Sequence, residues 1–269
     1  GISELDYNLI NKLEENRKNA YGNEEYGIDD LINIFCNQKN DVQKKLTMYL
    51  LNKGCHNSTI NNLNRLTTLK TQTEIDSYKK YLEQILEITN ADAGDYVEAV
   101  DNITSQKNAE LVLAFIKQGY RNNNITSVAQ IARYGGYDRL NKLLQEINTN
   151  DAMKIELGKL LALAYGNRFS NMEEFEGSGL LESEKFSAYQ LYNIKYDAKK
   201  VKDRDLLNKY PNMSADDIIN LAKYDDNLYN KLIETDLLKR FKVQDAVNIA
   251  QNIEEINALG LLDIPDLSG

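Results

Sequence analysis

The sequence is poor in the residues that interrupt helices and in those that build metal or redox sites. It contains 2 prolines, no tryptophan, 2 cysteines and 1 histidine in 269 residues. Because proline lacks an amide hydrogen and breaks helix interiors, its scarcity favours an all-α protein. No stretch approaches the roughly 18 consecutive apolar residues that cross a bilayer, so we expect no membrane insertion.

The small number of cysteine and histidine side chains leaves few routes to a metal centre or a covalent catalyst. Cys36, Cys55 and His56 are the only such residues, and no Cys-x-x-Cys pair occurs. A structural zinc site normally uses four ligands at short spacings. We therefore predict no metal and no cofactor, two reduced thiols that are buried or half-buried, and His56 at a helix end or on the surface.

The net charge of −9 disfavours general nucleic-acid binding, because that binding depends on neutralising phosphates with basic side chains. A local basic stripe on an acidic protein would be an exception. Acidic residues interleave with both basic clusters of this chain, which favours a solvated, mixed-charge helix surface. The basic candidates are Lys199, Lys200, Lys202 and Arg204, and Lys239, Arg240 and Lys242.

A short phrase recurs along the chain: Asp or Ser, two apolar residues, Asn or Gln, an apolar residue and usually alanine. It occupies 217–222 and 245–250, with looser copies at 30–35 and 127–132. Such recurrence is typical of stacked structural repeats. With weaker copies included, the fifth position returns about every 31 residues. These positions are Ile34, Leu63, Ala99, Ile131, Leu163, Leu191, Leu221 and Ile249.

Each copy is predicted to be the first helix of a helical hairpin. Hydroxyl residues that suit helix caps precede two copies, Ser214 in one and Thr126 and Ser127 in the other. Within a copy, apolar residues at i, i+3 and i+4 form one helix face. Turn-forming residues follow at 37–38, 134–136, 166–167 and 224–226, and then comes a second apolar stripe. The stripe residues are Leu140, Leu143, Leu144, Leu228, Leu232, Ile233, Ile256, Leu259 and Leu262.

A single hairpin cannot bury both of its apolar faces, whereas stacked hairpins can. We therefore predict an all-α fold, an α-solenoid or right-handed superhelix of about eight stacked helix-turn-helix units, as one array over 1–269. Two stretches deviate from the repeat. Residues 67–90 resemble one longer helix. The acidic, glycine-containing segment 168–186 is predicted to be a hinge or insertion that separates two lobes. The apolar face of the longer helix is predicted to consist of Ile75, Tyr78, Leu82, Ile85 and Leu86.

The segment 127–140, Ser-Val-Ala-Gln-Ile-Ala-Arg-Tyr-Gly-Gly-Tyr-Asp-Arg-Leu, resembles the repeats of transcription-activator-like effectors and their bacterial relatives. The similarity extends over about three units. It implies a superhelix whose inter-helix loops track the DNA major groove, here at 134–135, 224–225 and 252–253. The chain departs from that pattern in two ways: its glycine pair occurs once, at 135–136, with acids in the equivalent place elsewhere, and its repeat length varies from 28 to 36 residues.

We predict a non-catalytic scaffold that binds a protein partner along its surface. Stacked hairpins present long binding surfaces, and tyrosine, with 17 copies here, is an effective interface residue. An acidic scaffold favours a partner with a basic or amphipathic segment. The tyrosines at or after the predicted turns are the candidates: Tyr134, Tyr137, Tyr165, Tyr189, Tyr192, Tyr196, Tyr224 and Tyr229.

Two alternatives stay open, a repeat-type nucleic-acid-binding protein and an all-helical enzyme whose site the sequence does not reveal. No catalytic residue is nominated, because adjacent carboxylates such as Asp216 and Asp217 do not face each other on a helix. The chain starts at Gly1, so we expect a tag remnant or a region of a larger, bacterial effector-like protein. Without a signal-peptide pattern, we expect a cytoplasmic location or delivery into a host cytosol.

Overall fold

The computed structural model describes residues 2–15, 28–38, 40–55, 71–91, 93–148, 150–165 and 172–260. These residues form helices and connecting turns, with no strand among them, so the predicted all-α class is confirmed. The chain divides into two compact units, residues 1–171 and 172–269. The boundary lies inside 168–186, where the sequence analysis placed a hinge or insertion.

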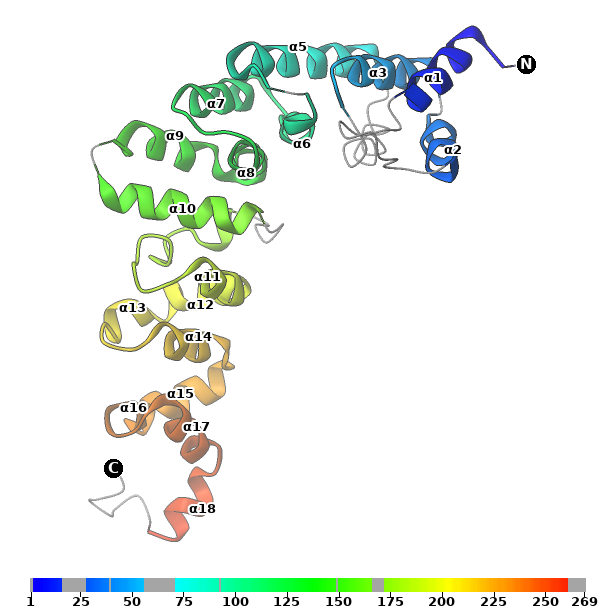
Figure 1. The fold of residues 1–269 in the computed structure, drawn as a ribbon. Coiled ribbons are helices and arrows are strands. Elements are labelled where there is room, and N and C mark those ends of the chain that lie inside the picture. Colours follow the sequence, from blue (N-terminus) through cyan, green and yellow to red (C-terminus); the bar gives the residue numbers. More distant parts are fainter. Residues whose placement is uncertain are drawn as a thin grey trace. The chain divides into compact units, whose positions relative to one another are not determined.

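Unit 1 begins with α1 and ends with α10 (Figure 1). Its described elements are α1 (Glu4–Glu15), α2 (Ile28–Asn37), α3 (Asp41–Asn52), α5 (Gln72–Thr89), the 3-10 turn η2 (Ala93–Asp95), α6 (Val97–Asp101), α7 (Gln106–Lys117), α8 (Asn123–Ile131), the π turn η3 (Ala132–Gly136), α9 (Tyr137–Glu146) and α10 (Asp151–Tyr165).

Helices of unit 1 pack in two rows. One row runs α1, α3, α5, α7, α9, and the other runs α6, α8, α10, each helix contacting the next in its row. Contacts between α5 and α6 and between α7 and α8 join the rows. The interface is apolar: Phe115 of α7, Val128 of α8 and Leu160 of α10 are fully buried. Helices that alternate between two rows in this way bury an apolar face on each neighbour.

Unit 2 begins at η4 and ends with α18. Its described elements are η4 (Met172–Glu174), α11 (Ala188–Ile194), η5 (Lys195–Asp197), α12 (Ala198–Asp203), α13 (Leu206–Lys209), α14 (Ala215–Lys223), α15 (Asp226–Glu234), α16 (Leu237–Arg240), α17 (Val243–Gln251) and α18 (Ile253–Ala258).

The recurring phrase forms the core of unit 2. The copies at 217–222 and 245–250 lie in α14 and α17, which contact each other, and α14 also contacts α11. Ser214 caps α14 as predicted, because its hydroxyl accepts a hydrogen bond from the Asp217 amide at 3.1 Å. Leu221 is fully buried. The predicted break at 224–226 is present, and Asp225 caps the start of α15.

Several expectations about individual residues are corrected. α8 begins at Asn123, after Asn122 in a positive-φ conformation, so Thr126 and Ser127 lie inside the helix rather than capping it, and Ser127 is buried. Ile233 and Leu259 are exposed rather than packed. Cys36 is also exposed, whereas Cys55 is buried. His56, Leu63, Leu262 and 166–167 lie outside the described residues.

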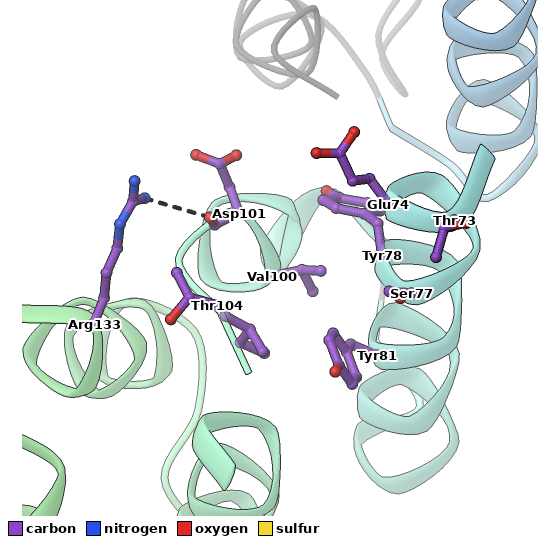
Figure 2. Close-up of a pocket in the computed structure, with 10 residues that line it drawn as sticks. Thr73, Glu74, Ser77, Tyr78, Tyr81, Val100, Asp101, Thr104 and Arg133 are labelled. Atoms are coloured by element: carbon purple, nitrogen blue, oxygen red, sulfur yellow. Dashed lines mark hydrogen bonds between the residues drawn. The ribbon is translucent and has the colours of Figure 1, made fainter. Parts of the chain in front are cut away.

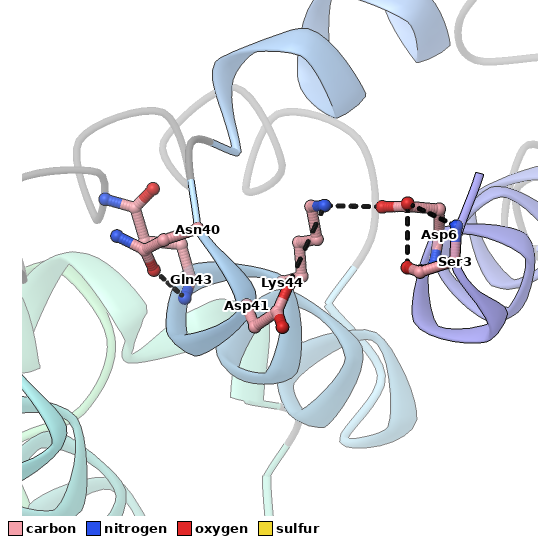
Figure 3. Close-up of polar contacts among 6 residues, drawn as sticks. All are labelled: Ser3, Asp6, Asn40, Asp41, Gln43 and Lys44. Carbon is pink, nitrogen blue, oxygen red and sulfur yellow. Dashed lines mark hydrogen bonds and ion pairs between the residues drawn. The ribbon is translucent and has the colours of Figure 1, made fainter. Parts of the chain in front are cut away.

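An ion pair joins the first helix to its neighbour in unit 1 (Figure 3). The Lys44 ammonium on α3 contacts the Asp6 carboxylate on α1, and the Ser3 amide and hydroxyl donate to the same carboxylate at 2.9 and 2.7 Å. The hydrogen bonds from Lys44 and Ser3 lower the pKa of Asp6 from 3.8 to about 2. This carboxylate is therefore a charged link between α1 and α3 at neutral pH.

Candidate functional site: a groove in unit 1

A groove of about 640 Å³ lies between α5, α6 and the π turn η3 (Figure 2). All of its lining residues belong to unit 1. Its walls combine tyrosine and aliphatic side chains with hydroxyls and two carboxylates. This mixture is typical of sites that bind a ligand through shape and a few placed polar groups.

Helix α5 forms one wall because of its spacing and its cap. Thr73, Ser77 and Tyr81 are four residues apart, so they lie on one face, and all three line the groove. A capping box between Thr71 and Glu74 starts the helix: the Thr71 hydroxyl accepts from the Glu74 amide, and the Glu74 carboxylate accepts from the Thr71 amide at 2.9 Å. The cap fixes where this face begins.

Tyr78 ties α5 to α6 at the base of the groove. Its ring is buried, and its hydroxyl donates to the Val97 carbonyl at 3.2 Å. Burial raises the pKa of the Tyr78 phenol well above its ordinary value, and nearby Cys55 and Asp101 act in the same direction. The phenol therefore stays protonated and keeps its role as a donor.

The α6 side supplies an apolar wall and an acidic rim. Val100 is buried and Ile103 is half-buried, and both line the groove. Figure 2 shows the carboxylates of Asp101 and Glu74 directed toward the same end of the groove. The Asp101 carboxylate has no ion-pair partner among the described residues. With Arg133 counted, the lining carries two carboxylates and one guanidinium, so its net charge is negative and favours a cationic group.

Arg133 lies at the far side of α6, on the π turn that follows α8. Its guanidinium donates to the backbone carbonyl of Asp101 at 3.5 Å and to Oδ1 of Asn102 at 3.3 Å. The turn depends on glycine: Gly135 has φ 87, and a Cβ on Gly136 would lie 2.3 Å from Cγ2 of Ile131. Turns of this kind often occur near functional sites.

The groove lining contains hydroxyls and carboxylates but no histidine or cysteine. Its hydroxyls belong to Thr73, Ser77 and Thr104, and no histidine or cysteine lines it to serve as a base or nucleophile. Over the described ranges, no three His, Cys, Asp or Glu side chains converge to hold a metal ion. Among these same residues no helix is both long and apolar enough to span a membrane.

The tyrosines predicted from the sequence lie elsewhere. Tyr134, Tyr165, Tyr189, Tyr192 and Tyr196 are exposed, and Tyr224 is half-buried. Tyr137 is half-buried, with the Lys107 ammonium 3.7 Å from its ring centroid. Tyr229 is corrected from a surface candidate to a packing residue, because it is 6% exposed and stacks on Arg204.

None of those tyrosines lines the groove, which uses Tyr78 and Tyr81. Sequence reasoning identified Tyr78 as an apolar-face residue of a helix over 67–90 but found no site there. The spacing of Thr73, Ser77 and Tyr81 marks one face of α5, yet it carries no information about what α6 places opposite. Only the packing of α6 against α5 reveals the groove.

Arg204 does not belong to a basic surface patch. It is 7% exposed, and its guanidinium donates to the carbonyls of Leu221 and Tyr224 at 2.6 and 2.9 Å and pairs with Asp226. Arg204 is buried rather than part of a surface patch because its side chain caps the end of α14. Lys239 pairs with Asp236 at 2.9 Å, and Lys200 pairs with Asp197 at 2.9 Å. Lys199, Lys202, Arg240 and Lys242 are exposed.

Comparisons of the chain with protein-family models, with curated proteins and with solved structures found no match. The resemblance to transcription-activator-like effector repeats therefore stays a prediction. What the chain does must be argued from the groove and the surrounding surface.

Proposed function

We propose that the protein is a non-catalytic helical-repeat scaffold that binds a segment of a partner protein in the groove of unit 1. The observation that carries this proposal is the combination of Tyr81 and the aliphatic Val100 and Ile103 with an acidic rim. Aromatic and aliphatic surface supplies the contact area, and the rim selects by charge. The partner segment is accordingly basic or amphipathic.

The packing of each unit supports the repeat architecture. In unit 1 the rows α5, α7, α9 and α6, α8, α10 alternate, and in unit 2 the phrase-bearing helices α11, α14 and α17 contact one another in order. This is the neighbour-to-neighbour contact pattern of an α-solenoid. We extend it to a superhelix of about eight hairpins, each of about 31 residues.

The alternatives account less well for the groove. Carboxylates at Glu74 and Asp101 repel phosphate, which disfavours nucleic acid at this site. An enzyme needs converging groups with matched proton affinities, and the Glu74 carboxylate of the groove is already used by the helix cap, where it accepts from the Thr71 amide and hydroxyl. A DNA-shift assay at about 150 mM salt tests the nucleic-acid alternative directly.

The test uses labelled peptides of about 15 residues in three sets, basic-apolar, acidic-apolar and neutral, with binding measured by fluorescence anisotropy. We expect the basic-apolar set to bind and the other two to bind about tenfold or more weakly. Asp101→Asn removes a rim charge and should weaken binding. Ser77→Arg places a bulky cation in the groove and should abolish it.

Matched controls test whether binding depends on the groove itself or only on the net charge of the protein. Asp138→Asn and Gln145→Arg make the same charge changes at exposed sites on α9, away from the groove lining. Both should bind like the parent protein. Equal losses in the Asp101 and Asp138 variants, or unchanged binding by Ser77→Arg, would show that the groove is not the site.

A further inference from the structure

Unit 2 presents an exposed face of tyrosine and lysine along α11, η5 and α12. Tyr189, Tyr192 and Tyr196 follow one another at i, i+3 and i+7, and they are 64%, 37% and 79% exposed. Lys199 and Lys202 continue the same stretch of chain and are exposed. We call these five residues the tyrosine–lysine face.

The opposite side of these helices is firmly held. Leu191, Ile194 and Ala198 are fully buried, and α11 and α12 both contact α14. A capping box between Ser187 and Gln190 starts α11, and the Gln190 amide nitrogen also donates to Asp216 on α14 at 2.9 Å. The tyrosine–lysine face is therefore carried by three consecutive short elements, and the packing of α11 and α12 on α14 sets their orientation, so its rings stay outward.

Lys195 arranges two of the three rings. Its side chain is buried against the fold, and its ammonium lies 4.9 Å from the ring centroid of Tyr192 and 4.6 Å from that of Tyr196. A cation at this distance attracts both ring faces. Because the rings are arranged before a partner arrives, less conformational entropy is lost on binding than for two free tyrosines.

The charge of this face is positive but small. Lys200 is already paired with Asp197 at 2.9 Å. Lys199 forms no ion pair among the described residues, and Lys202 contacts the Glu176 carbonyl at 3.5 Å, which leaves its charge uncompensated. Two available lysines suit a partner with a few negative charges. They do not suit a nucleic-acid strand, which carries a charge at every nucleotide and needs many cations.

We infer that the tyrosine–lysine face is a second docking surface, which binds an acidic segment of a protein that also carries apolar side chains. Carboxylates of the segment pair with Lys199 and Lys202, and its apolar side chains pack on Tyr189, Tyr192 and Tyr196. Tyrosine is effective here because its large ring gives area while its hydroxyl remains in water. The surface is independent of the groove, which lies in the other unit and prefers the opposite charge.

The experiment measures anisotropy with the full chain and two probes, the acidic-apolar peptide set and a single-stranded oligo-dT of about 20 nucleotides, at about 150 mM salt. The double variant Tyr189→Ala/Tyr196→Ala should weaken acidic-peptide binding about tenfold or more. Tyr165→Ala, at an exposed tyrosine of unit 1, is its control. Lys199→Glu/Lys202→Glu should abolish binding, whereas Lys242→Glu on unit 2 should leave it unchanged.

The inference is supported if both double variants lose acidic-peptide binding while Asp101→Asn and Ser77→Arg keep it. This outcome does not depend on whether the groove binds a peptide. Failure of every acidic peptide to bind at about 1 mM would overturn the inference. So would binding that the tyrosine variants leave intact. Binding of oligo-dT that both double variants abolish would instead assign the face to single-stranded nucleic acid. Far-ultraviolet circular dichroism of each variant verifies that the helices are retained.

Discussion

The groove of unit 1 and the tyrosine–lysine face of unit 2 both place tyrosine at the surface, but among charges of opposite sign. The groove is lined by Tyr81 and, toward its other end, by the carboxylates of Glu74 and Asp101. On the face, the three tyrosines are followed by the exposed Lys199 and Lys202, and Lys195 lies beneath two of the rings. The net charge of −9 averages over these regions. A partner responds to the charges within about a Debye length of it, roughly 8 Å, and so meets two different surfaces.

The two units are also held together by different arginine contacts. Unit 1 uses the half-buried Arg139, whose guanidinium contacts both oxygens of the buried Glu156. Unit 2 uses Arg204, which bonds mainly to the carbonyls at the end of α14. Arg139 joins α9 to the next helix, α10, and Arg204 joins the end of α12 to α14 and α15. Buried cations of this kind act as packing residues, so counting basic residues in a sequence overestimates the surface available to anions.

The largest effect is expected from charge placed in either core. Leu221→Asp in α14 and Leu140→Asp in α9 each put a carboxylate at a fully buried site. Each should cost about 4 kcal/mol or more of unfolding free energy. Because α14 contacts α11 and α17, hydrogen exchange should show lost protection in all three helices. Loss confined to the substituted helix would contradict the repeat model.

The next largest effect on stability is expected from removing the arginine of unit 2. Arg204→Ala leaves the carbonyls of Leu221 and Tyr224 without their donor and removes a cation 4.3 Å from the Tyr229 ring centroid. We expect a loss of about 2–3 kcal/mol, measured by urea denaturation. Lys199→Ala, at an exposed site, should change stability by less than about 0.5 kcal/mol. A similar small change for both would mean that Arg204 is not structural.

Two glycines of unit 1 should respond differently to replacement by alanine, because one is required by its close packing and the other is not. Gly136→Ala would set a Cβ 2.3 Å from Ile131 Cγ2 and 2.9 Å from its carbonyl oxygen. It should destabilise unit 1 by about 1–3 kcal/mol and, by shifting Arg133, weaken peptide binding in the groove. Gly158→Ala in α10 meets no atom within 4 Å and should stabilise the helix by about 0.5–1 kcal/mol. Thermal unfolding of both variants measures the contrast.

The smallest effect is expected on the pH dependence of the stability of unit 1, to which Asp6 contributes. Its pKa is lowered from 3.8 to about 2 in the folded protein. Such a carboxylate contributes stability that is fully present above pH 3.8 and is lost as pH falls through 3.8 toward 2. Asp6→Asn should therefore flatten the pH dependence of unfolding in this window. If the two proteins show the same slope, the contact with Lys44 does not persist in solution.

Local features were predictable because they depend on neighbouring residues. Ser214 caps α14, and the helix over 72–89 buries Ile75, Leu82 and Ile85 as its spacing predicted. The start of α8 was missed because Thr126 and Ser127 satisfy the same rule as a true cap, while Asn122 begins the helix through a rare positive φ. A cap motif identifies residues able to cap a helix, and the backbone conformation decides which one does.

What this sequence determines by itself is the helical class, the recurrence of a hairpin phrase and the apolar faces that must be covered, since each follows from residue spacing. The tertiary structure alone decides which polar and aromatic residues are buried and which stay available at the surface. It buries Arg204 and Tyr229, leaves Tyr196 outward, and brings Asp101 on α6 into one groove with Tyr81 on α5. Contacts between helices far apart in the chain set these outcomes, because each side chain is buried or exposed by whatever element packs against it.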